Sequence, residues 1–460
     1  MENINAKDNI DDNKDYDKIY IDNIFRNKPI TLTSHVNMFS TLFGTSKENN
    51  FSLLDYINSV VILDEIQAYN NNIWNHIFKM LFTYSKLLNI KFIIMSATLP
   101  DFSYINIDKD IVITKLLSNT DKYYKSKLFK DRVKLDFSML QNASLNSSYD
   151  VLQDLKSKIF NNLDKKVIVE FISKRDARLF FDEIKNSDKI VSNNIPVYEI
   201  TGDDNNYERK KVLNTIKNNN LPCIVICTQT IEAGTDIDMD IGFKDISFID
   251  SEEQFLGRIN RSAKKDNAIV YFFNYTDSKK IYKADMRIGF DLLKDDIKEA
   301  LINKDFNSYF LKVMEKVVKE SNKNNNLNIE AFLKNVGLLN YSKVKEDLTL
   351  IKNNNSRQIF LNYDYQFEDG EVVSGKDIWN EYKMILNDYS LSYTKKQVLL
   401  SNIKSKMNIF MYNVNIYNDS MYICDEEITN ILYIENGEEY IKDNKFDSIK
   451  FYESLNGVII

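Results

Sequence analysis

The sequence contains few of the residues on which metal centres, disulfide frameworks and membrane spans depend. Its 460 residues include two histidines, His35 and His76, and three cysteines, Cys223, Cys227 and Cys424. This excludes a metal centre built on several histidines, and three unclustered cysteines predict no disulfide framework and fit a reducing compartment. No apolar run approaches the ~20 residues of a membrane helix, and the polar, acidic start of the chain has no signal-peptide core. We therefore expect a cytoplasmic protein without membrane contact.

The chain also lacks an excess of positive charge. Its formal net charge is -7, whereas a protein that coats nucleic acid is broadly basic. A local basic groove is still available, because 60 residues are lysine or arginine. With 43% hydrophobic and 28% charged residues the composition is typical of a folded chain, and the length allows two to four domains.

The order of the apolar runs predicts an α/β fold with two parallel sheets. Residues 30–36 are expected to form a strand that enters a helix, and the apolar run before Asp64 predicts a strand buried on both faces. A helix over 74–88 and a second buried strand before Ser96 complete a strand–helix–strand crossover. The later runs predict a second sheet with strands at 167–173, 196–200, 223–228, 246–250 and 268–274, and with helices near 175–186, 207–218 and 252–260.

These patterns divide the chain into five segments: a polar N-terminal segment 1–27, a first α/β domain 28–118, a linker 119–149, a second α/β domain 150–280, and a helical, then mixed α/β region 281–460. Aromatic residues in the last region either offer a stacking surface for nucleic-acid bases or pack as ordinary strand residues, and we favour packing. Asparagine clusters, such as residues 70–72, are interpreted as polar loops without a function.

Two adjacent carboxylates, Asp64 and Glu65, follow the first buried strand. In open parallel sheets ligands bind at the carboxyl ends of the strands, and an acid pair there suits phosphoryl transfer. Asp64 would hold Mg²⁺ and Glu65 would orient or deprotonate the attacking water, while Gln67 would sense the γ-phosphate. The alternative is structural, because a strand often ends in an aspartate that caps the next helix.

The triplet Ser96, Ala97 and Thr98 follows the next buried strand. Its hydroxyl groups are expected to form hydrogen bonds with the acid pair on the neighbouring strand. A change in the bound nucleotide would then be transmitted to other parts of the protein. The alternative is a turn that its own hydroxyl groups cap.

In the second sheet, two stretches add groups that suit a phosphate. The stretch QTIEAGTDID contains Gly234, which allows a tight backbone turn, and Asp236, which presents a carboxylate. The stretch EEQFLGRINR places Arg258 and Arg261 on one helix face, where two guanidinium groups would meet the charge of a transferring phosphoryl group. The same stretch contains Gln254 and Gly257.

In this order, the stretches DEIQ, SAT, QTIEAGTD and QFLGRINR resemble the two motor domains of superfamily two helicases. The flanking stretches KPITLTSHVNMFSTLFG and IIMSATLP are similar to the helicase–nuclease of type I CRISPR interference. The resemblance covers roughly residues 28–275. It implies an α/β fold of two RecA-like parallel-sheet motor domains, the first incomplete, plus an α+β C-terminal region. It also implies an ATP-dependent DNA helicase or translocase, a nucleoside triphosphate hydrolase of antiviral defence.

The resemblance assigns roles to the matching residues. The implied catalytic residues, with Asp64 on the metal, are Asp64, Glu65, Gln67, Arg258 and Arg261. The implied ATP-binding residues are Gly234, Asp236, Gln254 and Gly257, and the implied coupling residues are Ser96, Ala97 and Thr98. The residues expected along the nucleic-acid backbone are Thr33, Ser34, Ser173, Lys174, Arg175, Thr228, Gln229 and Thr230. The implied cofactors are ATP and Mg²⁺, and the implied partners are single-stranded DNA and a guide-RNA surveillance complex.

The sequence departs from this family in two respects. The acid pair needs a lysine from a phosphate loop of the form GxxxxGK[ST], but no glycine precedes Gly44, and the only Gly-Lys pair is Gly375-Lys376. The family's His-Asp nuclease domain needs several histidines, and both histidines here are interpreted as structural. We therefore expect a fragment, truncated or split, that lacks the phosphate loop and the nuclease domain and that a separate chain would complete.

Two other interpretations stay open. The chain would alternatively be a non-catalytic remnant of a motor that binds nucleic acid or protein. It would otherwise be a motor from another branch of superfamily two, because such motors grip the phosphate backbone and their motifs do not separate DNA from RNA.

Overall fold

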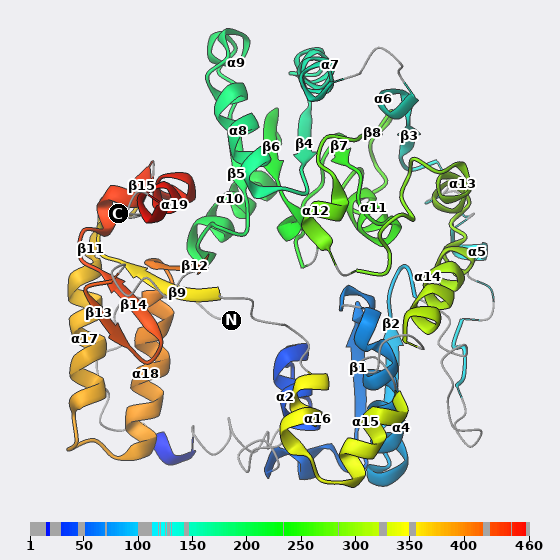
Figure 1. Cartoon of the computed structure of the whole chain (residues 1–460). Helices are drawn as coiled ribbons and strands as arrows, with labels where there is room; N and C mark the ends of the chain where they lie inside the picture. Colours follow the sequence, from blue (N-terminus) through cyan, green and yellow to red (C-terminus); the bar gives the residue numbers. More distant parts are fainter. Residues whose placement is uncertain are drawn as a thin grey trace. The chain divides into compact units, whose positions relative to one another are not determined.

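The computed structural model describes residues 15–18, 29–44, 51–69, 71–99, 113–117, 119, 121–124, 126, 129, 131–141, 147–232, 234–283, 285–321, 329–348, 356–416, 424–442 and 444–456. The chain forms two compact units. The first unit contains residues 1–59 and 354–444, and the second contains residues 60–353 and 445–460. Figure 1 labels the helices and strands of both units.

The second unit begins with a strand–helix–strand crossover. Strand β1 (Val60–Asp64) pairs in parallel with β2 (Lys91–Met95), and helix α4 (Trp74–Leu88) connects them. The register sets Asp64 opposite Met95, so both strands end at the same edge. The predicted strands and helix are confirmed here, because continuous apolar runs flank an amphipathic helix.

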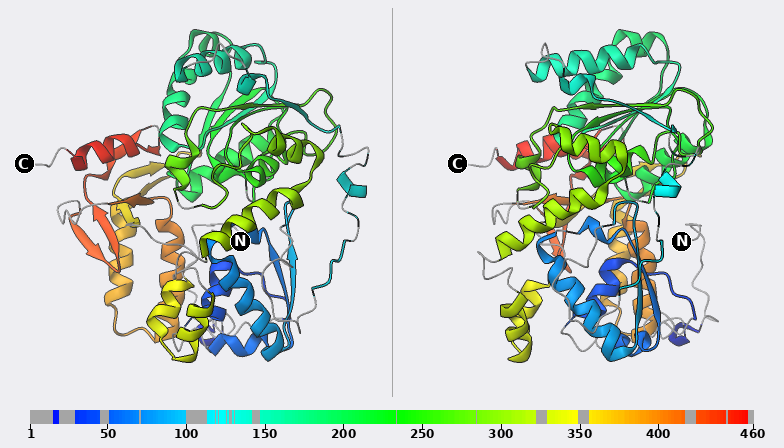
Figure 2. Two further views of the ribbon diagram at one scale, coloured as in Figure 1. Left: turned by 45° about the vertical axis from the view of Figure 1, so that its right-hand side comes forward. Right: turned by 90° about the vertical axis from the view of Figure 1, so that its right-hand side faces the viewer.

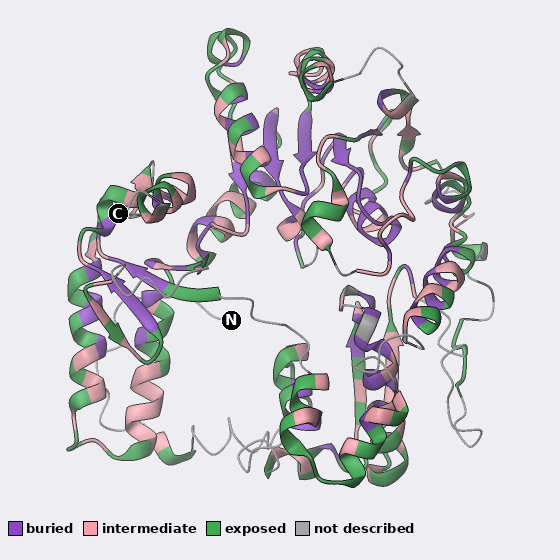
Figure 3. Ribbon diagram, viewed as in Figure 1, coloured by how far each residue is buried: buried purple, intermediate pink, exposed green. Residues whose placement is uncertain are grey.

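The expected burial of β1 on both faces is wrong. Val60 is 59% exposed and Ile62 is 61% exposed, whereas Leu63 is buried. Strands β4 (Lys166–Glu170) and β6 (Cys223–Cys227) of the second sheet, by contrast, are buried along their whole length (Figure 3). Among the described residues β1 and β2 form a sheet of two strands, so nothing described covers one face of β1.

The second sheet has six parallel strands in the order β3-β8-β7-β4-β6-β5. Its strands are β3 (Lys134–Asp136), β4 (Lys166–Glu170), β5 (Val197–Ile200), β6 (Cys223–Cys227), β7 (Ile241–Asp245) and β8 (Ile269–Phe273). Its helices are α6 (Ser138–Gln141), α7 (Ser148–Phe160), α8 (Lys174–Lys185), α9 (Asp188–Ser192), α10 (Asn206–Asn218) and α11 (Ile249–Leu256). Helices cover both faces of this sheet (Figure 2).

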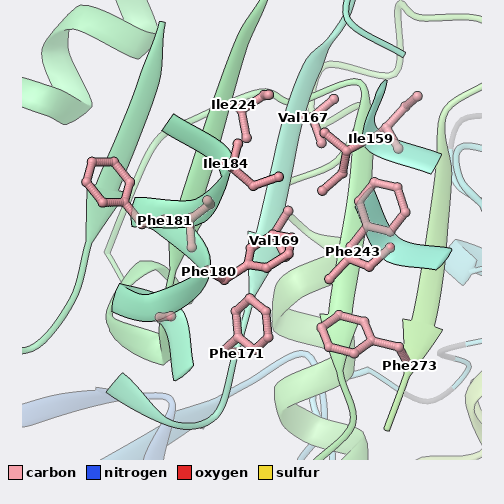
Figure 4. Packing of buried hydrophobic residues seen from close by; sticks show 14 of the residues in the cluster. Ile159, Val167, Val169, Phe171, Phe180, Phe181, Ile184, Ile224, Phe243 and Phe273 are labelled. Atoms are coloured by element: carbon pink, nitrogen blue, oxygen red, sulfur yellow. The ribbon is translucent and has the colours of Figure 1, made fainter. Parts of the chain in front are cut away.

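The main core lies between the six-stranded sheet and helices α7 and α8. Val167 and Val169 of β4 and Phe243 of β7 contact Phe180 and Ile184 of α8 in one buried cluster (Figure 4). Helix α11 packs on the opposite face, where a Cβ on Gly242 would lie 2.7 Å from the ring of Phe255. The sheet is therefore buried on both faces, as a parallel sheet requires.

Strand β7 was not predicted, and the strand predicted at 246–250 is wrong. The true strand, IGFKD, contains Gly242 and Lys244, which weaken an apolar strand pattern. Ile249 begins α11 instead. Strand β3 lies inside the predicted linker, because an edge strand of three residues leaves little pattern.

The predicted strand at 30–36 is also wrong. Residues 31–34 form no strand, and Ser34 caps α2 (His35–Phe43) by accepting a hydrogen bond from the Asn37 amide at 3.3 Å. Serine at this position favours a helix start over a strand.

The rest of the second unit is mainly helical, as the sequence predicts. Its helices are α5 (Asp121–Tyr124), α12 (Ser278–Tyr282), α13 (Asp295–Asn303), α14 (Phe306–Ser321), α15 (Ile329–Gly337), α16 (Tyr341–Asp347) and α19 (Ser448–Asn456), and strand β16 is Lys445–Phe446.

The first unit contains a four-stranded mixed sheet in the order β12-β9-β14-β13. The strands of that sheet are β9 (Ser356–Leu361), β12 (Met411–Asn415), β13 (Glu426–Ile428) and β14 (Ile431–Ile434). The unit also contains strands β10 (Asp364–Gln366), β11 (Val372–Ser374) and β15 (Ile441–Lys442) and the long helices α17 (Gly375–Asn387) and α18 (Tyr393–Met407). The rings of Trp379 and Tyr433 stack at 4.9 Å, and both are buried. These aromatic residues therefore pack the core rather than present a stacking surface.

Candidate nucleotide cleft

A cleft of about 1330 Å³ lies in the second unit, where the carboxyl end of β1 faces helix α11. Asp64, Glu65 and Ala97 line one wall. The facing wall includes Gly234, Thr235, Asp236, Gln254, Gly257, Arg258 and Arg261. The structure thus brings acidic and basic residues from four separate stretches of the sequence to one cavity.

Glu65 occupies a strained backbone position at the end of β1. Its φ of 57° lies in the left-handed region, which is uncommon for residues other than glycine. Its amide donates to the Met95 carbonyl at 3.0 Å, which extends the ladder between β1 and β2 by one residue. Such strain is often found at functional sites, and here it turns the Glu65 side chain sharply at the strand end.

The Glu65 carboxylate joins three of the predicted stretches. One of its oxygens accepts hydrogen bonds from Ser96 Oγ at 3.2 Å, from Gln254 Nε2 at 3.2 Å and from Gln67 Nε2. Gln67 is almost completely buried, and its Oε1 has no hydrogen-bond partner among the described residues. Asp64 at the strand end is exposed to the cleft.

The Ser96 triplet is a turn that also contacts the acid pair, so both interpretations of it hold in part. Ser96 Oγ accepts from the Thr98 amide at 3.0 Å while it donates to Glu65. The Tyr124 hydroxyl donates to the Ala97 carbonyl at 2.5 Å. Thr98 is buried, and its hydroxyl has no partner in the described part of the chain.

The two arginines hold the backbone of the stretch 231–235. Arg258 donates to the Ile231 carbonyl at 3.1 Å and to the Glu232 carbonyl. Arg261 donates to the Thr235 carbonyl at 3.3 Å and lies 3.3 Å from the carboxylate of Asp236. Burial and the neighbouring Arg261 lower the pKa of Arg258 from its ordinary value, and a bound anion would oppose this shift.

Gly234 and Gly257 meet different geometric demands. Gly234 has a φ of 70°, in the left-handed region that glycine tolerates best. A Cβ on Gly257 would lie 3.0 Å from the Gln254 carbonyl oxygen. Asp236 is exposed, and a hydrogen bond from Lys217 lowers its pKa.

A buried ionic cluster beneath these stretches was missed in the sequence. Lys244 of β7 donates to Glu170 of β4 and to Glu232 at 3.3 Å, and Ser251 of α11 donates to the same Glu232 oxygen at 2.5 Å. Lys244 is fully buried; burial lowers its pKa, but the surrounding carboxylates outweigh this and raise the pKa well above its usual value. The available signal was Glu170, a charged residue that interrupts a predicted strand of otherwise apolar residues.

Arg132 was also missed. Its guanidinium donates to the carbonyl oxygens of Leu256 at 3.1 Å and Ile259 at 2.9 Å, at the end of α11. It therefore stabilises the helix that carries Gln254, because a cation is favourable at the C-terminus of a helix.

Most residues expected along a nucleic-acid backbone lie at the carboxyl ends of β4 and β6. A Cβ on Gly202 would be 2.9 Å from the Lys174 side chain and 3.8 Å from that of Thr230. Lys174 pairs with Asp203 at 2.6 Å, and Ser173 caps α8. The other residues in the second unit are Arg175, which is exposed, Thr228, which is buried, and Gln229, which donates to the Tyr282 hydroxyl. Thr33 and Ser34 belong to the first unit.

The cleft fits a magnesium nucleotide in part. The Asp64 carboxylate and the facing arginines suit a metal ion and phosphate oxygens, respectively. Among the described residues there is no cluster of three or more histidine, cysteine, aspartate or glutamate side chains that would hold a metal alone.

Residues 166–264 match the family model described as CRISPR-associated nuclease/helicase Cas3, C-terminal. The CRISPR-associated nuclease/helicase Cas3 of Methanocaldococcus jannaschii is 25% identical over 264 residues, which are 55% of this chain and 34% of that protein. Its counterpart in Methanothermobacter thermautotrophicus is 27% identical over 235 residues, 47% of this chain and 26% of that protein. The chain thus spans about a third or less of these relatives.

The crystal structure of T. fusca Cas3-ADP superposes with a TM-score of 0.50 at 13% identity, and the match covers 86% of this chain and 53% of that chain. At this identity the match concerns the fold alone, and it agrees with RecA-like α/β domains. In the described part of the chain, no helix has the length and apolar character to cross a bilayer.

Proposed function

We propose that this chain, which is a CRISPR Cas3-type protein, is the motor portion of an ATP-dependent DNA helicase or translocase of type I CRISPR interference. The observation that carries the proposal is the Glu65 carboxylate, which accepts hydrogen bonds from Ser96 and from Gln254 at 3.2 Å each. A residue placed to activate water is thereby bonded both to the next strand of its own sheet and to the helix of the second sheet. Through this contact, a change in the nucleotide bound in the cleft would affect the positions of both sheets.

ATP and Mg²⁺ would bind between the two walls of the cleft, where bound Mg²⁺ neutralises phosphate charge. Asp64 would hold the metal ion, and Glu65 would orient the attacking water with Gln67 beside it. Arg258 and Arg261 would exchange some of their bonds to backbone carbonyls for bonds to the phosphate. The exposed Lys174 and Arg175 would contact the backbone of single-stranded DNA.

A phosphate loop of the form GxxxxGK[ST], which these 460 residues do not contain, would complete the site. The exposed apolar side chains of Val60 and Ile62 support this proposal, because a parallel sheet is normally covered on both faces. A guide-RNA surveillance complex would deliver the DNA, and the site of action would be the cytoplasm.

The test is ATP hydrolysis with and without single-stranded DNA, for the chain alone and for the chain mixed with an N-terminal piece that contains GxxxxGK[ST]. We expect DNA-stimulated hydrolysis only in the mixture, and its loss in Asp64→Asn. The matched control is Asp364→Asn, the same change at an exposed site in the first unit. If the mixture shows no hydrolysis, the proposal is wrong.

A second candidate is a nucleic-acid-binding remnant without catalysis. This candidate predicts single-strand binding that weakens with salt and does not respond to ATP. A related motor with a preference for RNA would instead show hydrolysis stimulated by RNA and not by DNA.

A further inference from the structure

A buried chain of hydrogen bonds connects the two parallel sheets through residues that do not line the cleft. It begins at Asn71, six residues after Glu65, in the asparagine cluster that the sequence analysis interprets as a loop without function. Asn71 is fully buried. Its Nδ2 donates to Asp285 Oδ1 at 3.1 Å, and its Oδ1 accepts from the Met286 amide at 3.1 Å. Both ends of the side-chain amide are therefore used.

Arg287 continues the connection to the second sheet. Its guanidinium donates to Asp285 at 2.6 and 3.0 Å and to Asp250 Oδ2 at 2.5 Å. The same group lies 4.4 Å from the centre of the Phe248 ring, and Arg287 is 6% exposed. Asp250 is in the first turn of α11, one helical turn before Gln254. The connection thus ends on the helix that contacts Glu65.

The charges of this connection require a neutral side chain at residue 71. Arg287 lies between the carboxylates of Asp250 and Asp285; burial lowers its pKa, but the two carboxylates raise it further, so it stays charged. One guanidinium therefore already compensates two buried carboxylates. Aspartate at residue 71 would add a third carboxylate beside Asp285, without a cation to pair with it.

We propose that Asn71 is a positioning residue: through Asp285, Arg287 and Asp250 it locks the segment after the acid pair to α11. The lock keeps Gln254 within hydrogen-bonding distance of Glu65. The effect on ATP hydrolysis rests on the proposed function, but the lock itself does not require hydrolysis and is testable without it.

The experiment measures the distance between the two sheets in the full chain by pulsed electron spin resonance. Spin labels are attached at Leu87→Cys in α4 and Leu179→Cys in α8, which are 71% and 51% exposed, in a Cys424→Ser background. We expect a narrow distance distribution that becomes broad in Asn71→Asp. The loss of one buried, satisfied hydrogen-bonding group shifts such an equilibrium by about tenfold.

The matched control is Asn214→Asp, the same change at an exposed position of α10, which should keep the narrow distribution. Asn71→Ala removes both hydrogen bonds without adding charge, and provides a second test if Asn71→Asp does not fold. The proposal is overturned if a folded variant at residue 71 keeps the wild-type distribution.

Hydrolysis in the complemented mixture separates this proposal from the proposed function. For a positioning role, Asn71→Asp should lower kcat by about the same tenfold and change KM for ATP less. If Asn71→Asp broadens the distance distribution but the wild-type mixture hydrolyses no ATP, the proposed role of Asn71 is supported and the proposed function is overturned.

Discussion

The two parallel sheets of the second unit have similar apolar strands but differ in how those strands are covered. In the six-stranded sheet, Ile168 of β4 is fully buried between helices on both faces. In the two-stranded sheet, Ile62 of β1 is 61% exposed (Figure 3). The difference shows that an apolar strand does not ensure its own burial. The six-stranded sheet carries its own covering helices, whereas one face of β1 has no cover from any described residue.

The two sheets also differ in how their charged side chains are paired. In the six-stranded sheet, Lys244 supplies a cation to buried Glu170 and Glu232 from within the chain. At the end of β1, Asp64 has no ion pair with a described residue, and only neutral side chains hydrogen-bond to Glu65. The buried cluster thus contains its own cation, whereas no described cation forms an ion pair with the acid pair at the end of β1.

The largest predicted effect is on the internally neutralised cluster. Lys244→Met removes the cation from buried carboxylates and should lower the free energy of unfolding of the six-stranded sheet by about 3–5 kcal/mol. Urea unfolding followed by hydrogen exchange of β4 and β7 measures this. The control is Lys217→Met, because Lys217 pairs with Asp236 at the surface and should matter little. Equal effects of the two changes would contradict the assigned role of Lys244.

The next prediction compares two isoleucines in the middle of parallel strands. Ile168→Thr places a hydroxyl in a packed core and should destabilise the chain by about 2–3 kcal/mol. Ile62→Thr should change stability by less than about 0.5 kcal/mol in the chain alone. With the complementing piece added, Ile62→Thr should weaken the complex, as measured by titration. A large loss of stability in the isolated Ile62→Thr chain would show that β1 is already covered.

The prediction that is smallest over a single pH unit concerns the dependence of stability on pH. Burial raises the pKa of Glu252 to about 8, although Lys244 opposes the shift. The folded state therefore holds a proton that the unfolded state releases near pH 4.5, so stability falls as pH rises from about 4.5 to about 8. The slope for one proton is at most about 1.4 kcal/mol per pH unit. Urea unfolding at several pH values should show a shallower decline in Glu252→Gln than in the wild type, and equal slopes would contradict the assignment.

The sequence predicts those elements whose side chains all agree with one pattern. The strand before Asp64, helix α4 and strand β6 are predicted closely, because continuous apolar runs or helical spacing mark them. Strand β7 was missed because a tertiary contact with α11 demands Gly242, and the buried cluster demands Lys244. Neither requirement is visible until the partner elements are in place.

The contacts of the candidate site also differ in whether the sequence predicts them. The meeting of Glu65, Ser96 and Gln254 was foreseeable, because the carboxyl ends of parallel strands share one edge and the stretches occur in a specific order. The bonds of Arg258 to backbone carbonyls and the use of Asn71 were not. Each depends on where a loop closes, and an asparagine in a polar cluster gives no sign that it is buried.

The uncovered face of β1 has a consequence for how the protein is made. The exposed apolar side chains of Val60 and Ile62 favour association with other apolar surfaces, including those of a second copy. If a partner covers this face, the usable amount of the protein depends on the supply of that partner relative to its own synthesis. Co-production with that partner should increase the yield of dispersed protein, whereas slower synthesis alone would reduce aggregation only by dilution.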